Sequence, residues 1–213
     1  MILAFFLFSG KNQEFKISDL FDVKQGRQNI AGQSTQLEFN PSNVKVLTIK
    51  SINFSSASIN PSLLLDYTSS SDIAPGSYLT ASCYILNRVG KNRGMSLLNV
   101  DFDFEENKII AGNDFIFLRP RSIILDNLPM FHAILDVALF DDTLKKSNDD
   151  EKSKLNYITV KELQDKKISI PSENFSEMAQ RFMEIYEDYI QKLKNFNLSK
   201  KRLEEFKNKF LRK

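Results

Sequence analysis

Hydrophobic and polar positions follow two different patterns along the chain. In residues 1–170, short runs of β-branched and aromatic side chains alternate with turn-forming segments, which predicts short strands. The longest of these runs are residues 44–52, 78–89 and 108–118. Helical spacing predicts one turn around Leu20 and Phe21, and about three turns over residues 128–139. We therefore expect a compact mixed α+β domain with a β-sheet and short helices.

The end of the chain has the pattern of one long helix. Asn174, with Glu177 three residues later, predicts a capped helix start. An apolar residue then recurs at every seventh position, and a second row is apolar except at Lys192 and Ser199. A helix over residues 175–211 is about 55 Å long, and a stripe of that length needs a second helix to cover it. The residues predicted to form this dimer contact are Phe175, Met178, Phe182, Ile185, Tyr189, Phe196, Leu203, Phe206 and Phe210.

A helix that folds back on its own domain is the alternative explanation for this apolar stripe.

Composition agrees with a globular chain, because 42% of the 213 residues are hydrophobic and 26% are charged. The charge is unevenly spread, with a net −3 over residues 1–150 and a net +5 over residues 151–213. We therefore divide the chain into a domain at 1–170 and a helix at 171–213.

Cysteine and histidine usage excludes several classes of site. Cys83 and His132 are the single residues of their types, so an internal disulfide and a closed zinc site are excluded. A reducing, cytoplasmic setting is expected. The apolar run at residues 2–8 is too short for a membrane span and lacks the basic residues of an export signal, so we interpret it as a buried strand or ordered tail.

Searches for enzyme signatures leave one weak pattern. The Gly90-Lys91 pair lacks the upstream glycine and the Ser or Thr of a phosphate-binding loop. Asp101, Asp103 and Glu106 with Lys108 resemble a magnesium-dependent nuclease cluster, although we favour an acidic turn between two strands. His132 is expected to be a partly buried, hydrogen-bonded residue. We predict no catalytic residue, no metal and no cofactor.

Two polar loops are better candidates for function. Residues 24–29 and 88–94 each combine cations and amide side chains with glycine. Arg and Lys neutralise phosphates and pair with guanine, and Asn and Gln pair with adenine, so both loops suit DNA contact. Ordinary solvated turns are the alternative. The candidate DNA-binding residues are Lys24, Gln25, Arg27, Gln28, Asn29, Lys50, Asn53, Arg88, Lys91, Asn92 and Arg93.

The order of several short segments adds a family resemblance. These segments are residues 8–10 and 15–27, 46–52, 74–79 followed by 88–90, 155–163, and 168–171 followed by the long helix. In this order they resemble a target-recognition domain and spacer helix of the specificity subunit of type I restriction–modification systems. The match departs from the family at Phe15, often Trp there, at Ser77, commonly acidic, and at the helix entry after Pro171.

The resemblance implies a function and a set of partners. Family members carry two recognition domains and two antiparallel spacer helices, whereas this chain has room for one of each and resembles a half-subunit. A homodimer through the helix would then bind double-stranded DNA at two inverted half-sites. DNA methyltransferase subunits, which bind S-adenosylmethionine, and a restriction subunit would perform the chemistry. The alternatives are a protein-interaction module without a DNA role, favoured by the acidic first part, and the small nuclease.

Overall fold

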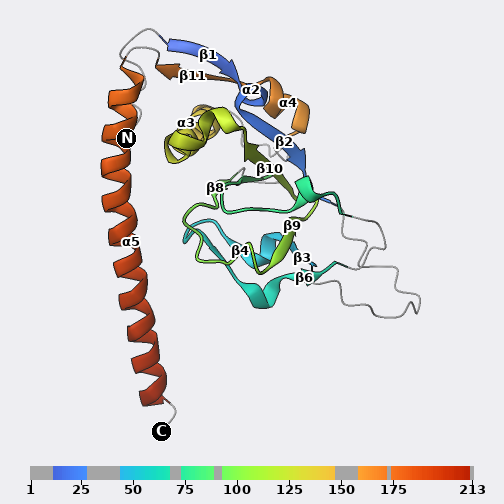
Figure 1. The fold of residues 1–213 in the computed structure, drawn as a ribbon. Helices are drawn as coiled ribbons and strands as arrows, with labels where there is room; N and C mark the ends of the chain where they lie inside the picture. Colours follow the sequence, from blue (N-terminus) through green and yellow to red (C-terminus); the bar gives the residue numbers. More distant parts are fainter. Residues whose placement is uncertain are drawn as a thin grey trace, which may run out of the picture. The chain divides into compact units, whose positions relative to one another are not determined.

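The computed structural model describes residues 12–27, 44–67, 73–88, 93–146, 158–171 and 174–211. The strand or tail expected at residues 2–8 lies outside these ranges. The chain forms two compact units, Met1–Ser172 and Glu173–Lys213 (Figure 1). This is the predicted α+β class, with several small sheets followed by a long C-terminal helix, and the prediction of fold class is confirmed.

The first unit contains short strands and few helices. Its strands are β1 Asn12–Lys16, β2 Phe21–Gln25, β3 Val44–Leu47, β4 Ile52–Asn53, β5 Ser58–Ile59, β6 Leu65–Asp66, β7 Tyr84–Asn87, β8 Gly94–Ser96, β9 Lys108–Ala111, β10 Phe115–Pro120 and β11 Lys167–Pro171. Among the residues that the structure describes, its helices are α2 Ile17–Leu20, α3 Leu128–Lys146 and α4 Val160–Asp165, with short 3-10 turns at Ile49–Ser51, Pro61–Leu63, Pro75–Ser77 and Ser122–Asn127.

Two larger sheets and two strand pairs organise this unit. The four-stranded sheet has the order β2-β10-β7-β8 and is antiparallel throughout. The three-stranded sheet has the order β6-β3-β9, in which β3 and β9 are parallel. β1 pairs with β11, and β4 pairs with β5. The β1–β11 pair joins the first and last described strands of the unit.

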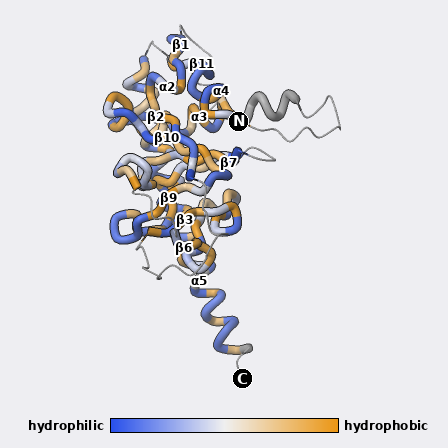
Figure 2. The backbone as a smooth tube through the Cα atoms, turned by 90° about the vertical axis from the view of Figure 1, so that its right-hand side faces the viewer, coloured by the Kyte–Doolittle hydropathy of each residue, from blue (hydrophilic) through white to orange (hydrophobic). Residues whose placement is uncertain are grey.

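The main hydrophobic core lies between these sheets. It includes Leu47 from β3, Ile85 from β7, Ile109 from β9 and Phe117 from β10, all of which are buried. Residues 115–118 of β10 are all buried, so both faces of this strand are covered. Figure 2 shows the hydrophobic positions gathered along these strands. Burial on two faces explains why residues 109–111 and 115–118 are apolar without alternation.

The predicted strand runs are shorter and more interrupted than expected. Residues 108–118 form β9 and β10, because the chain turns between Ala111 and Phe115. Residues 44–52 end as a strand at Leu47, where Ser51 Oγ accepts from Thr48 N at 2.9 Å and donates to Thr48 O at 2.8 Å. These bonds close a 3-10 turn in place of continued pairing. The predicted helical turn is α2, and Phe21 already belongs to β2.

Helix α3 is longer than the predicted 128–139 and is the apolar helix of this unit. Its first turn contains Pro129, whose missing N–H is not needed at that position. Among the described residues, Ser122–Leu139 is the one segment long and apolar enough to span a membrane. Several of its apolar side chains, including Met130, Ile134 and Leu135, are buried within the protein. These contacts are those of a core helix.

Two polar bonds attach α3 to the four-stranded sheet. His132 Nδ1 lies 2.7 Å from Ser96 Oγ on β8, and the Tyr84 hydroxyl of β7 donates to Asp136. His132 is 2% exposed, and burial lowers its pKa from 6.5 to about 4. Desolvation raises the pKa of Asp136 to about 6. The expected hydrogen bond of this histidine is present, but the side chain is fully buried and not partly buried as predicted.

Acid should destabilise the fold through His132. The folded state holds this imidazole neutral, while the unfolded chain binds a proton below about pH 6.5. The stabilisation is therefore present above pH 6.5 and is lost as the pH falls towards 4. Asp136 changes the stability in the opposite direction, because its raised pKa means that the folded state binds a proton there more readily than the unfolded chain does. The variant Asp136→Asn removes this contribution and leaves the contribution of His132. In that background the free energy of unfolding is expected to fall by roughly 2–3 kcal/mol between pH 7 and 4.5, measured by urea titration.

The control for this prediction is the double variant His132→Gln with Asp136→Asn. Its unfolding free energy should vary less over the same pH range, because it lacks the imidazole. The contribution of the remaining carboxylates is the same in both proteins and cancels when the two are compared. A second measurement is direct, since His132 is the one histidine of the chain and its NMR signals need no assignment. An imidazole pKa near 6.5 in the folded protein would contradict the prediction.

The second unit is the helix α5, Phe175–Leu211, which agrees with the predicted 175–211. It begins at Asn174, whose φ of 57° lies in the left-handed region that Asn tolerates better than most residues. Asn174 O accepts from Met178 N at 2.9 Å, the first bond of the helix. Figure 2 shows a mostly hydrophilic helix interrupted by hydrophobic positions.

Candidate nucleic-acid interface

Asn113 brings the two predicted polar loops together. It is an exposed residue in the turn between β9 and β10. Gln25 Nε2, at the end of β2, donates to Asn113 Oδ1 at 2.5 Å. Arg88 Nη1, which follows β7, donates to Asn113 O at 3.0 Å and to its Oδ1 at 3.3 Å. The loops of Gln25 and Arg88, which are more than sixty residues apart in the chain, are therefore both held by hydrogen bonds to Asn113, their shared anchor.

Gly26 makes the first of these loops possible. Gly26 N donates to Phe115 O at 2.9 Å, and Arg27 N donates to Ala111 O at 2.8 Å. A Cβ on Gly26 would lie 1.9 Å from Gly112 O and 2.6 Å from Ala111 O, so any larger residue would collide with the turn. The missing side chain is what allows the backbones to approach this closely.

The cations of the first loop are held by other segments. Arg27 Nη1 donates to Tyr67 Oη at 3.3 Å, and Lys24 Nζ donates to Gly76 O at 3.1 Å. Lys24 is exposed and Arg27 is half-buried. The bonds orient both side chains and leave Lys24 accessible to an anion.

Arg88 differs from the expectation that it lies on a solvated loop. It is 4% exposed, and besides its bonds to Asn113 its N–H donates to Asp114 O at 2.9 Å. Its carbonyl accepts from Ile158 N at 3.3 Å. An arginine at this depth supports the loop instead of offering its guanidinium to a ligand. We correct its assignment from a DNA-contact residue to a structural one.

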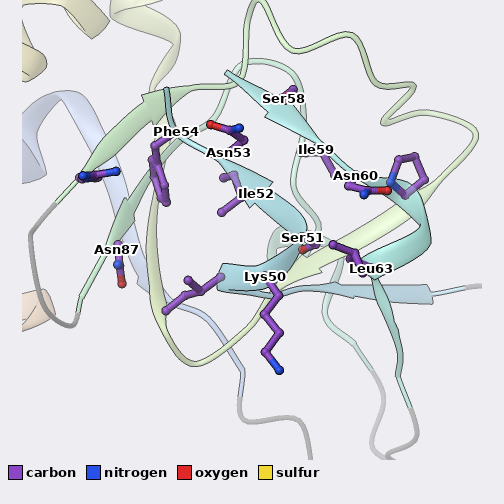
Figure 3. A pocket seen from close by; sticks show the side chains of 13 residues that line it. Lys50, Ser51, Ile52, Asn53, Phe54, Ser58, Ile59, Asn60, Leu63 and Asn87 are labelled. Carbon is purple, nitrogen blue, oxygen red and sulfur yellow. The ribbon is translucent and has the colours of Figure 1, made fainter. Parts of the chain in front are cut away.

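A pocket of about 810 Å³ lies beside the second loop (Figure 3). Lys50, Asn53, Asn87 and Arg93 all line it, and Asn87 N donates to Arg93 O at 2.8 Å. Its apolar lining includes Ile52, which is buried. In Figure 3, Asn53 and Lys50 point in different directions from the segment that carries them. Three of the predicted contact residues, Lys50, Asn53 and Arg93, thus line one hollow.

The amide of Asn53 has a local role as well. Its Oδ1 accepts from Ser55 N at 3.0 Å and from Ser56 N at 3.2 Å, which closes the turn after β4. Among the predicted candidates, Gln28, Asn29, Lys91 and Asn92 lie outside the described residues.

Sequence reasoning missed Asn113, Asn87 and Tyr67. Asn113 ends the tripeptide Ala111-Gly112-Asn113, whose residue types are typical of a turn. This turn is the available signal, because turns carry recognition residues when a rigid scaffold positions them. Asn87 ends an apolar run and Tyr67 resembles a core aromatic. Neither has a local pattern that separates it from a packing residue.

The acidic segment has the geometry of a turn. Asp103 Oδ1 accepts from the backbone N–H groups of Glu105 and Glu106, both at 2.9 Å, and Asn107 Nδ2 donates to Asp103 O. Within the described ranges, no group of three or more His, Cys, Asp or Glu side chains is placed to hold a metal ion. The carboxylate of Asp103 is engaged with its own backbone.

No protein-family model matches the chain, and no curated protein gives a significant match. Solved structures give matches. The HsdS subunit from Thermoanaerobacter tengcongensis has a TM-score of 0.47 and 16% identity over 86% of this chain and 39% of that chain. A chain of a type I R-M system complex has a TM-score of 0.49 and 15% identity over 87% and 43%.

The type I restriction–modification S subunit from M. genitalium has a TM-score of 0.45 and 13% identity, covering 91% of this chain and 44% of that chain. The chain therefore spans about two fifths of the length of these solved structures. The structures to which it is similar are type I restriction–modification specificity subunits.

Proposed function

We propose that this chain is a non-catalytic DNA-recognition protein that acts as half of a type I specificity subunit. The observation that carries the proposal is the shared anchor at Asn113, which holds the loop of Lys24 and Arg27 next to the segment of Asn87 and Arg93. Cations and amides from separate segments then meet on one scaffold. This combination is what phosphate contact and base readout together require.

The described side chains divide into two roles. Lys24 and Lys50 are exposed cations suited to phosphate contact. Arg93 is exposed beside a pocket whose lining also includes Asn53 and Asn87. Arginine and asparagine form the bidentate contacts that distinguish guanine and adenine. We therefore assign base readout to the pocket and DNA positioning to the two lysines.

The helix α5 supports the second part of the proposal, a homodimer. Its stripe residues include side chains that are more than half exposed in the single chain, such as Ile185 at 57%, Phe196 at 66% and Phe210 at 67%. Apolar exposure on this scale along one helix marks a contact surface. A second copy would pair the helices and present two identical recognition domains to two inverted half-sites.

The partners follow from the resemblance to specificity subunits. DNA methyltransferase subunits with bound S-adenosylmethionine, and a restriction subunit, would supply the chemistry, while this chain selects the site. The chain itself would need no cofactor and no metal, and it would act in the cytoplasm.

Arg93→Ala should weaken or relax DNA binding. The duplex that the unchanged protein enriches from a random-sequence pool is the probe, and affinity is measured at several salt concentrations. A lost base contact costs about 1–3 kcal/mol per half-site and relaxes the preference at that base pair. A lost phosphate contact lowers affinity for all sequences and reduces the salt dependence.

Lys161→Ala is the control for charge alone, because Lys161 is an exposed cation on α4. It should bind the enriched duplex as the unchanged protein does. Failure of the unchanged protein to enrich any sequence would contradict the DNA-recognition proposal. So would an Arg93→Ala protein that binds DNA with the same affinity, sequence preference and salt dependence as the unchanged protein.

A further inference from the structure

Two asparagine side chains of the pocket can act only as hydrogen-bond donors. Asn53 and Asn60 both line the pocket. Oδ1 of Asn53 accepts from Ser55 N at 3.0 Å and from Ser56 N at 3.2 Å. Oδ1 of Asn60 accepts from Ser62 N at 3.1 Å and from Ser62 Oγ at 2.8 Å. A carbonyl oxygen has two lone pairs, so both oxygens are fully used and each amide offers a ligand only its N–H groups.

The same bonds fix which way each amide is turned. A backbone N–H donates to the oxygen of an amide and cannot donate to its NH₂ group. The backbone of the two turns therefore determines the orientation of both side chains. Figure 3 shows Asn53 and Asn60 at opposite ends of the β4–β5 pair. Both side chains are exposed, so their N–H groups are accessible to a ligand.

The charged side chains of the pocket are donors as well. Lys50 and Arg93 are exposed members of the lining, and both side chains donate hydrogen bonds and accept none. None of the described residues that line the pocket is Asp or Glu. A ligand that fits these groups must therefore offer hydrogen-bond acceptors.

The remaining polar side chains of the lining are hydrogen-bonded or buried. Ser51 Oγ accepts from Thr48 N and donates to Thr48 O, so it has bonds in both roles. Ser58 Oγ lies 2.7 Å from Ser56 Oγ. Asn87 is 9% exposed. The side-chain groups that are exposed and still able to bond are therefore mainly N–H donors.

Resting on the proposed DNA-recognition function, we infer that this pocket reads the keto edge of guanine or thymine and rejects adenine and cytosine. In the major groove guanine presents O6 and N7 and thymine presents O4, all of which are acceptors. Adenine and cytosine present an amino group there. An amino group opposite Asn53 or Asn60 would place donor against donor and leave both unsatisfied. The bidentate contact of asparagine with adenine also needs a free carbonyl oxygen, which neither amide has.

The apolar part of the lining favours a base over a phosphate group. Ile49 is 41% exposed and Leu63 is 44% exposed, and both line the pocket. A phosphate would satisfy the donors but would leave this apolar surface in water. A base covers apolar surface with its ring, and thymine also with its methyl group. The β4–β5 pair is a two-stranded ribbon, which is a shape that the major groove admits.

Asn53→Asp tests the inference, because it exchanges a donor for an acceptor with little change in shape. In this variant Oδ1 keeps the bonds from the turn and Oδ2 takes the place of Nδ2. The full chain is used to enrich duplexes from a random-sequence pool. One half-site position should change from guanine or thymine to adenine or cytosine on the same strand, with a change in relative affinity of about 5- to 150-fold. Asn60→Asp should change a different position in the same way.

The matched control is Asn208→Asp, which makes the same exchange at an exposed position of α5 and should keep the original preference. If the unchanged protein enriches a sequence and neither pocket variant changes a position, the inference is overturned and the DNA-recognition proposal stands. A loss of affinity shared by all sequences would show that the pocket holds a phosphate, which also overturns it. If the unchanged protein enriches no sequence, the proposed function and the inference both fail.

Base analogues give a second measurement on the unchanged protein. In the enriched duplex, guanine is replaced by 2-aminopurine, which lacks O6, and thymine by 5-methyl-2-pyrimidinone, which lacks O4. At one position this replacement should lower the affinity of the unchanged protein by about 5- to 150-fold. The same replacement should have little effect on Asn53→Ala, which has already lost the donor. Equal effects on both proteins at every position would overturn the contact from Asn53.

Discussion

Phe206→Glu is expected to convert the protein from a dimer to a monomer at concentrations where the unchanged chain is dimeric. Phe206 is 59% exposed in the single chain and belongs to the apolar stripe of α5. Burying such a side chain contributes about 1.5–3 kcal/mol. A homodimer contains it twice, so the dissociation constant should rise by roughly 10²- to 10⁴-fold. Sedimentation equilibrium over a range of concentrations measures this change.

Asn208→Glu is the matched control for this prediction. Asn208 is exposed, lies in the same turn of α5 and falls outside the stripe, so it adds the same charge without entering the contact. It should leave the dimer unchanged. A monomeric unchanged chain, or equal dissociation of both variants, would show that the stripe does not pair with a second copy.

Gly26→Ala is expected to have the largest effect within the first unit. The added Cβ would lie 1.9 Å from Gly112 O, and both neighbouring contacts are backbone atoms that cannot rotate away. The loop must move, and the bonds from Gly26 N to Phe115 O and from Arg27 N to Ala111 O weaken. We expect a loss of about 2–3 kcal/mol in the free energy of unfolding, measured by urea titration.

DNA affinity should fall in the same variant, because the displaced segment carries Lys24 and Gln25. The control is Gly76→Ala, where the added Cβ would meet only Lys24 Nζ, at 2.9 Å. That atom ends a flexible side chain and can move, so the stability change should stay below about 1 kcal/mol. A Gly26→Ala protein as stable as the control would contradict the close approach of β2 to the turn.

Local patterns predicted the elements whose stability is itself local. The bounds of α5 agree with the seven-residue period, because a helix forms its backbone bonds within one turn and the period shows directly which side is apolar. The short strands were placed correctly only in part. The period could not show which way the side chains of β9 and β10 point, because burial on both faces removes the alternation that marks a strand.

The candidate site depended on contacts between distant segments. Gln25 and Asn113 are 88 positions apart, and the sequence contains no signal that their amides meet. Arg88 and Arg93 have the same chemistry in the same predicted loop, yet one is buried at 4% exposure and the other lines a pocket. Burial of a charged side chain is decided by what packs around it, and that is a property of the whole fold.

Taken alone, the sequence determined the α+β class, the long C-terminal helix with its apolar stripe, and the residue types available for DNA contact. These depend on period and composition, which are readable along the chain. The tertiary structure alone decided that the turn at Asn113 joins the two polar loops, that Gly26 must lack a side chain and that Arg88 is structural. Each of these depends on backbone segments approaching one another across the sheets, and only packing of the complete core brings them together.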